Sequence, residues 1–173
     1  QGRLGHGHSL YEHMIRAPLL MRYPGFFKAG ARVPEVVEQV DVFPTVLEVL
    51  GLPASKHVDG QSLIALIRSE PVARPRYAIT EFVDNRYSVR VGNWKMMMSS
   101  GDWGGLYHLE SDPGENKDRT KKRPIARKLC EIYLSEALAS PSKAHRRRLS
   151  TQQRRFKGAD AAMDSELRKR YDR

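Results

Sequence analysis

The sequence predicts an α/β fold that ends in a small four-stranded antiparallel sheet packed by a C-terminal helix. Several β-prone runs are separated by short turn-forming pairs such as Gly92-Asn93, as in an antiparallel meander. Apolar residues then recur at spacings of three and four over Pro124 to Ala139, as in an amphipathic helix. The predicted strands are residues 77–83, 87–91, 94–98 and 106–109.

A buried strand is expected before this sheet. Arg16-Ala17-Pro18 ends any helix that begins near Ser9, because proline cannot donate a hydrogen bond and disfavours the helical region for the residue before it. The apolar run Leu19 to Met21 then suits a strand buried on both faces, as in a parallel sheet covered by helices. Tyr23-Pro24-Gly25 closes it with a turn.

Two short helices are predicted between this strand and the meander. Phe43-Pro44-Thr45 opens the first, with proline in the first turn, where its missing N–H does no harm. Gly51 caps that helix and Pro53 prevents its continuation. Asp59-Gly60 forms a turn, and Ser62 to Arg68 is expected to form one or two further helical turns.

The C-terminal helix is expected to turn an apolar side to its neighbours and to be followed by a solvated tail. That side is predicted to carry Ile125, Leu129, Ile132, Tyr133 and Leu138. Cys130 is expected to be a small helix-packing residue. Beyond Pro141 the apolar pattern stops, and residues 143–157 hold seven basic side chains and no acidic one.

The charge is uneven along the chain and raises a second class of function. Residues 1–120 balance 14 Lys and Arg against 14 Asp and Glu, whereas residues 121–173 hold 16 against 6. A net charge of +10 is typical of nucleic-acid-binding proteins. The basic residues of 144–157 lack the interleaved aromatic rings that stack on bases, however. The sequence also contains no apolar run long enough for a transmembrane helix.

Five segments, in order, resemble the sulfatases of the alkaline-phosphatase-like superfamily. The first is HGHSLYE, continuing to IRAPLLMRYPG at Ile15 to Gly25, and the resemblance extends to about Ala139. It implies that the chain is the C-terminal portion of an alkaline-phosphatase-like α/β sandwich that hydrolyses sulfate esters. The later segments are PTVLEVLGLP at 44–53, DGQSL at 59–63, VRVGNWK at 89–95 and LYHLESDPGE at 106–115.

The resemblance implies a division of the chain and a set of cofactors. Residues 1–75 would be the incomplete end of the catalytic domain, 76–140 a sheet-plus-helix subdomain, and 141–173 an exposed basic tail. In this family a calcium ion and a formylglycine nucleophile act together, and their residues would lie before Gln1. The chain alone is therefore expected to be inactive. A phosphonate or phosphodiester hydrolase is the alternative, because tetrahedral oxyanions make similar demands on a site.

Two histidines are the candidate catalytic residues. Many members of the resembled family place a lysine four residues before the Tyr-Glu pair, and that position here is Gly7, between His6 and His8. A histidine can hydrogen-bond a sulfate oxygen and protonate a departing alkoxide near neutral pH. We expect His8, or else His6, to take this role. The alternative is a purely structural histidine in a loop, with its ring nitrogens hydrogen-bonded to backbone groups.

The remaining candidates concern the loop and the substrate. Tyr11 is expected to pack inward and Glu12 to pair with Arg16, both as anchors of the loop. Trp103, in a glycine-rich loop, is a candidate contact for a sulfated small molecule or glycan. Tyr107 and Trp94 could add to a sugar-stacking wall, although Trp94 is expected in the core. The resemblance alone suggests a periplasmic, secreted or lysosomal-type compartment.

Overall fold

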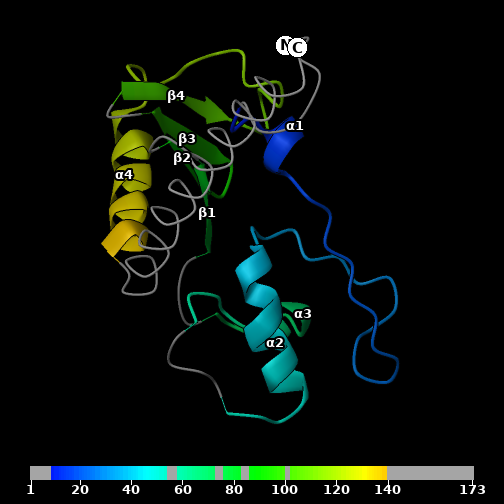
Figure 1. Cartoon of the computed structure of the whole chain (residues 1–173). Coiled ribbons are helices and arrows are strands. Elements are labelled where there is room, and N and C mark those ends of the chain that lie inside the picture. Colours follow the sequence, from blue (N-terminus) through cyan, green and yellow to red (C-terminus); the bar gives the residue numbers. More distant parts are fainter. Residues whose placement is uncertain (1–8, 54–57, 73–75, 83–85, 100–101, 140–173) are drawn as a thin grey trace, which may run out of the picture. The chain divides into compact units, whose positions relative to one another are not determined.

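The part of the chain that the structure describes contains four helices, one short 3-10 helix and four strands. The computed structural model describes residues 9–53, 58–72, 76–82, 86–99 and 102–139. Figure 1 labels the elements in chain order, apart from the 3-10 helix η1. They are α1 (Glu12–Ile15), η1 (Gln39–Asp41), α2 (Val42–Val49), α3 (Ile64–Ile67), β1 (Tyr77–Phe82), β2 (Arg86–Val91), β3 (Trp94–Ser99), β4 (Asp102–His108) and α4 (Pro124–Ala139).

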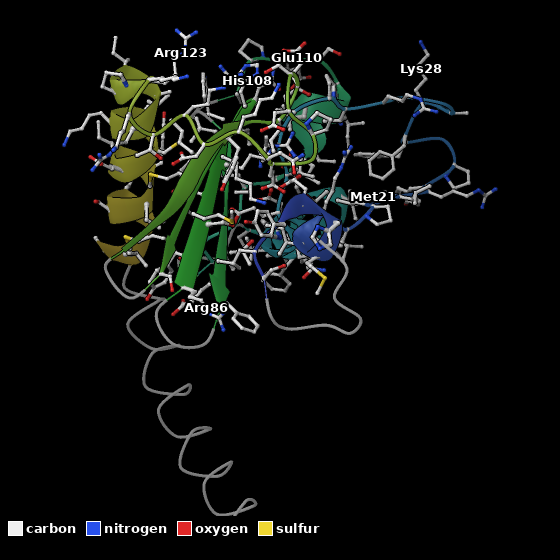
Figure 2. All side chains as sticks on the ribbon, turned by 90° about the horizontal axis from the view of Figure 1, so that it is seen from above. Met21, Lys28, Arg86, His108, Glu110 and Arg123 are labelled. Carbon is white, nitrogen blue, oxygen red and sulfur yellow. The ribbon has the colours of Figure 1, made fainter. Side chains whose placement is uncertain are left out.

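The four strands form the predicted antiparallel meander. Their order in the sheet is β1-β2-β3-β4, and each pair is antiparallel. Figure 2 shows Arg86 and His108 at opposite ends of the sheet, as the register requires. The fourth strand begins at Asp102 rather than at Leu106, so it includes most of the glycine-rich stretch that was expected to be a loop. A register shift between Met97 and Met98 accommodates this extension.

The register divides the sheet into two buried faces. Val89, Met96 and Leu106 lie opposite one another on one face, and all three are buried. Tyr77 lies on the same face by register, and its ring centroid is 4.9 Å from that of Tyr133 on α4. The other face carries Arg90, Lys95 and Tyr107, together with Met97. A sheet buried on both faces explains why its central strands hold so few exposed side chains.

Helix α4 has the predicted bounds but turns a different side inward. Its buried residues are Cys130, Leu134 and Ala137, spaced four and three apart. Ile125 and Ile132, which were expected inside, are exposed by 85% and 52%. The packing role predicted for Cys130 is confirmed. Two stripes of apolar residues run along this helix, and periodicity alone selected the one with the larger side chains.

A buried ion pair joins the helical segment to the start of the sheet. Asp41 and Arg76 are almost fully buried, and Arg76 Nη1 lies 2.9 Å from Asp41 Oδ2. The backbone N–H of Gln61 donates to Asp41 Oδ1 at 2.7 Å. Thr45 on α2 donates to the Asp41 carbonyl and accepts from Leu63 N–H. The predicted helices α2 and α3 are thus confirmed, and Asp41 links them to Arg76, the residue before β1.

The expected buried strand at Leu19 to Met21 is wrong for this chain. Residues 16–22 belong to no helix or strand, and Leu20 is exposed by 88%. Figure 2 labels Met21 on this segment and Lys28 on the irregular stretch that follows it. A strand forms only by pairing with a neighbouring strand, and no strand of the described residues pairs with Leu19 to Met21.

No helix of the described residues combines the length and apolar character that crossing a bilayer requires.

Candidate functional site

The segment that leads out of the histidine-bearing stretch is held by a cluster of four charged side chains, of which Lys95 and Glu115 are buried. Lys95, on β3, is exposed by 0%. Its Nζ lies 3.1 Å from Glu12 Oε1 and 2.8 Å from Glu115 Oε1. The contact with Glu115 is short but not aligned as a hydrogen bond, so its attraction is mainly electrostatic. Removing one partner of such a buried cluster costs about 3–5 kcal/mol, since it leaves an uncompensated charge.

Glu12 separates two cations that the sheet places face to face. Arg90 and Lys95 are directly opposite each other on β2 and β3. Like charges in that position destabilise a sheet. Arg90 Nη1 lies 3.0 Å from Glu12 Oε2, while Lys95 contacts the other oxygen of the same carboxylate. With Glu115 included, two cations face two carboxylates, and the cluster has no net charge.

The loop after β4 supplies the second carboxylate. Asp112 accepts hydrogen bonds from the backbone N–H groups of Asn116 and Lys117, at 3.1 and 2.8 Å. These bonds hold the pKa of Asp112 below its usual value. Glu115 has a left-handed backbone with φ of 53°, which is uncommon for a residue other than glycine. Its Oε2 accepts the backbone N–H of Glu12 at 2.6 Å.

Apolar contacts complete the attachment of the segment. Leu10, Met97 and Tyr107 are buried together, with the ring of Tyr11 packed against them. The ring centroids of Tyr11 and Tyr107 are 6.3 Å apart. Burial, with a contribution from Tyr11, raises the pKa of the Tyr107 phenol above its usual value. The phenol stays protonated and donates to the carbonyl of Gly104 at 3.1 Å.

The sequence predictions for the loop anchors are partly confirmed. Tyr11 packs inward as expected. The pairing of Glu12 with Arg16 is wrong, because Glu12 turns to Lys95 and Arg90 while Arg16 is exposed. Helix α1 is only four residues long. Glu12 therefore finds stronger partners on the sheet than one turn further along its own helix.

The predicted contacts to substrate have different outcomes. His6, His8 and the side chain of Trp103 lie outside the described residues. Tyr107 cannot belong to a sugar-stacking wall, because it is exposed by only 6%. Trp94 is half-buried rather than in the core. Its ring lies edge-on to that of His108, with the ring centroids 4.7 Å apart.

A pocket of about 220 Å³ lies at the other polar junction, around the Asp41–Arg76 pair. Four of its lining side chains are carboxylates and one is the arginine, whose Nη atoms already contact Asp41 and the Ser62 carbonyl. Such a lining repels an anionic ester. The described residues also contain no group of three or more His, Cys, Asp or Glu side chains that could hold a metal ion. The lining residues are Glu38, Asp41, Asp59, Gln61, Arg76, Tyr77, Tyr133 and Glu136.

Sequence reasoning missed Lys95 and Glu115. The available signal was the lysine itself, in the strand sequence Trp-Lys-Met-Met-Met at residues 94–98. A lysine at a buried strand position needs a carboxylate partner. Its partner could not be chosen from sequence, because Glu12 and Glu115 are 103 residues apart and meet only in the fold.

Comparisons with known proteins extend these observations. The family model described as N-sulphoglucosamine sulphohydrolase, C-terminal, matches residues 6–138. Arylsulfatase K of Homo sapiens is 33% identical over 131 residues, which cover 67% of this chain and 24% of that protein. The chain thus spans about a quarter of the length of the curated relatives that it matches.

Two solved structures show the same fold. One is a complex with its substrate D-glucosamine-2-N,6-O-disulfate; it is 22% identical, with a TM-score of 0.56 over 68% of this chain and 27% of that chain. The other is a phosphonate monoester hydrolase from Silicibacter pomeroyi, 21% identical, with a TM-score of 0.51 over 73% of this chain and 28% of that chain. The predicted fold class is confirmed.

The family match covers most of the chain, and it includes both histidines and the three segments that meet at Lys95. The chain therefore belongs to the N-sulphoglucosamine sulphohydrolase C-terminal family of the sulfatases.

Proposed function

We propose that the full-length enzyme hydrolyses sulfate esters and that this chain supplies its C-terminal part, with a histidine-bearing loop at the active site. The observation that carries the proposal is the family match over residues 6–138, which begins at the histidine pair. The firm attachment of the following segment, through Glu12, supports a loop that must hold a defined position.

The chemistry of the reaction assigns a role to the histidines. A sulfate ester presents negative oxygens to any attacking group, so catalysis requires cationic or hydrogen-bonding donors around it. His8 would donate to a sulfate oxygen or protonate the leaving alkoxide, and His6 is the second candidate. Calcium and a formylglycine nucleophile would be supplied by residues before Gln1, so nothing proposed for the present residues depends on a metal.

A sulfated sugar is the proposed class of substrate. One structurally similar protein binds D-glucosamine-2-N,6-O-disulfate as its substrate, and the fold is shared with this chain. Trp103 remains our candidate for stacking on a sugar ring, because aromatic faces pack well against the apolar face of a pyranose. The basic tail gives no reason to prefer nucleic acid, since its arginines lack interleaved aromatic residues.

The proposal is tested by His8→Ala in the full-length enzyme, assayed on phenyl sulfate and 4-nitrophenyl sulfate. Loss of a general acid should lower kcat by about 10²-fold on phenyl sulfate and much less on the nitrophenyl ester, whose phenolate leaves without protonation. Equal losses on both esters would indicate ground-state binding of sulfate instead. No loss with either His8→Ala or His6→Ala would remove the histidines from the mechanism.

Two controls belong to this experiment. His13→Ala changes an exposed histidine that stacks on Tyr11 with ring centroids 6.0 Å apart, and it should affect stability more than rate. Residues 1–173 alone should show no turnover. A full-length enzyme that cleaves phenylphosphonate esters or phosphodiesters faster than aryl sulfates would favour the alternative activity of the same superfamily.

A further inference from the structure

Glu12, in a helix of four residues, is attached at three points, two on the sheet and one on the loop after β4. Its two carboxylate oxygens contact Arg90 and Lys95, at 3.0 and 3.1 Å. Its backbone N–H donates to Glu115 at 2.6 Å. Helix α1 has four residues and no side-chain cap, so its own hydrogen bonds cannot fix its position. The attachment to the sheet does so instead.

Two of these contacts are directional hydrogen bonds, from Arg90 to the Glu12 carboxylate and from the Glu12 N–H to Glu115, in contrast to the apolar packing beside them. Leu10 and Tyr11 bury apolar surface against Tyr107, but apolar burial has little orientational preference. Ion pairs and hydrogen bonds hold both ends of the Glu12 residue, its carboxylate and its N–H, at defined distances. Lys95 is exposed by 0%, so water does not screen its ammonium group from the two carboxylates.

We propose that Lys95, Arg90 and Glu115 are positioning residues for sulfate ester hydrolysis, which they serve by fixing Glu12. This inference rests on the proposed function. His8 precedes Glu12 by four residues, so a shift of Glu12 moves the chain that carries the proposed donor. A misplacement of about 1 Å in a reacting group can cost up to about 10²-fold in rate. None of the three residues is assigned a contact with substrate.

The competing explanation is that the cluster serves only the stability of the fold. The two explanations differ in their dependence on the leaving group. A misplaced proton donor harms substrates with poor leaving groups most, whereas a smaller folded fraction lowers the rate on every substrate by the same factor. They also differ in additivity, because residues that act through one another do not have independent effects.

The test is Lys95→Met in the full-length enzyme, with the same pair of aryl sulfates. We expect kcat to fall by about 10-fold on phenyl sulfate and by about 3-fold or less on 4-nitrophenyl sulfate, with KM changed by less than about 2-fold. In the His8→Ala background, Lys95→Met should lower kcat by no more than about 2-fold. Equal losses on both esters, or full losses in the His8→Ala background, would overturn the inference.

Two further variants make the experiment decisive. Arg90→Gln removes a partly exposed ion pair with Glu12. It should lower kcat more on phenyl sulfate than on 4-nitrophenyl sulfate, by smaller factors than Lys95→Met. This variant tests the inference even if Lys95→Met fails to fold. Lys128→Met removes a lysine of an exposed pair, 3.6 Å from Glu131 on α4, and should change neither rate. If the unmodified enzyme cleaves neither aryl sulfate, the proposed function itself is wrong; if it cleaves both and the pattern is absent, only the positioning role is wrong.

Discussion

Gly60 lies in close contact with the backbone of Val40 and Asp41. A Cβ at this position would overlap the carbonyl oxygen of Val40, so Gly60 lies directly against η1. That approach lets Gln61 N–H reach Asp41. Gly60→Ala should therefore lower the free energy of unfolding by about 3 kcal/mol or more, measured by urea denaturation.

Gly51→Ala is the matched control for Gly60→Ala. Gly51 follows α2 with φ of 66°, and a Cβ there would meet nothing within 4 Å. Only the left-handed backbone opposes alanine at this site, which costs about 1–2 kcal/mol. A Gly60→Ala variant no less stable than Gly51→Ala would show that the backbone at Gly60 can move away from η1.

Asp112 should make stability depend on pH at the acidic end. The hydrogen bonds from Asn116 and Lys117 lower the pKa of its carboxylate in the folded chain. Below the ordinary aspartate pKa of about 3.9, the unfolded state therefore binds more protons at this residue than the folded state. Stability from Asp112 is complete above that pH and is lost as the pH falls through the lower folded pKa.

Asp112→Asn should flatten this part of the curve of unfolding free energy against pH, since asparagine does not titrate. The measurement is chemical denaturation of both proteins from pH 6 down to pH 2. Curves for the two proteins that run parallel over this range would contradict the role given to the carboxylate.

At the scale of the element, α4 can be tested through its cysteine. Cys130 is exposed by 0%, and burial raises the pKa of its thiol to about 11. The thiolate is the reactive form, so at pH 8 the folded chain should resist alkylation by iodoacetamide for hours. Guanidinium should release one reactive thiol per chain, because Cys130 is the single cysteine. Rapid labelling without denaturant would mean that α4 opens locally.

The elements themselves were largely predictable, whereas the orientation of α4 was not. Turn residues and β-prone runs located the meander because both signals are local. Helix α4 carries two apolar stripes, and the buried one holds Cys130, Leu134 and Ala137. Which stripe is buried depends on packing against the rest of the fold, which periodicity within the helix does not report. The strand expected at Leu19 to Met21 failed for the same reason, since a strand needs a partner that its own sequence does not supply.

At the scale of the whole molecule, large apolar side chains are exposed over residues 19–52. Many exposed large apolar side chains promote association. Residues 1–173 should therefore self-associate at micromolar concentration, and Leu20→Ser should reduce this without lowering the unfolding free energy by more than about 0.5 kcal/mol. The exposed side chains are Leu19, Leu20, Tyr23, Phe26, Val33, Phe43, Val46, Leu50 and Leu52.

Sedimentation velocity measures the association, and Lys28→Ser, on the same segment, is the polar control that should leave it unchanged. A Leu20→Ser variant that sediments like the unmodified chain would rule out this surface as the cause.

The candidate site, like the orientation of α4, could be predicted from sequence only in part. The histidine pair was visible in sequence, but the cluster around Lys95 joins residues that are far apart in the chain.

The opposed cations of β2 and β3 have a consequence for how the family can evolve. Loss of Glu12 would leave Arg90 and Lys95 facing each other, and loss of Lys95 would leave two carboxylates together. Each single change is harmful, whereas joint replacement by apolar residues removes the charges as a set. Among sulfatases of this family, Glu12, Arg90, Lys95 and Glu115 should therefore be inherited together or exchanged together, and a sequence that keeps only Lys95 should be rare.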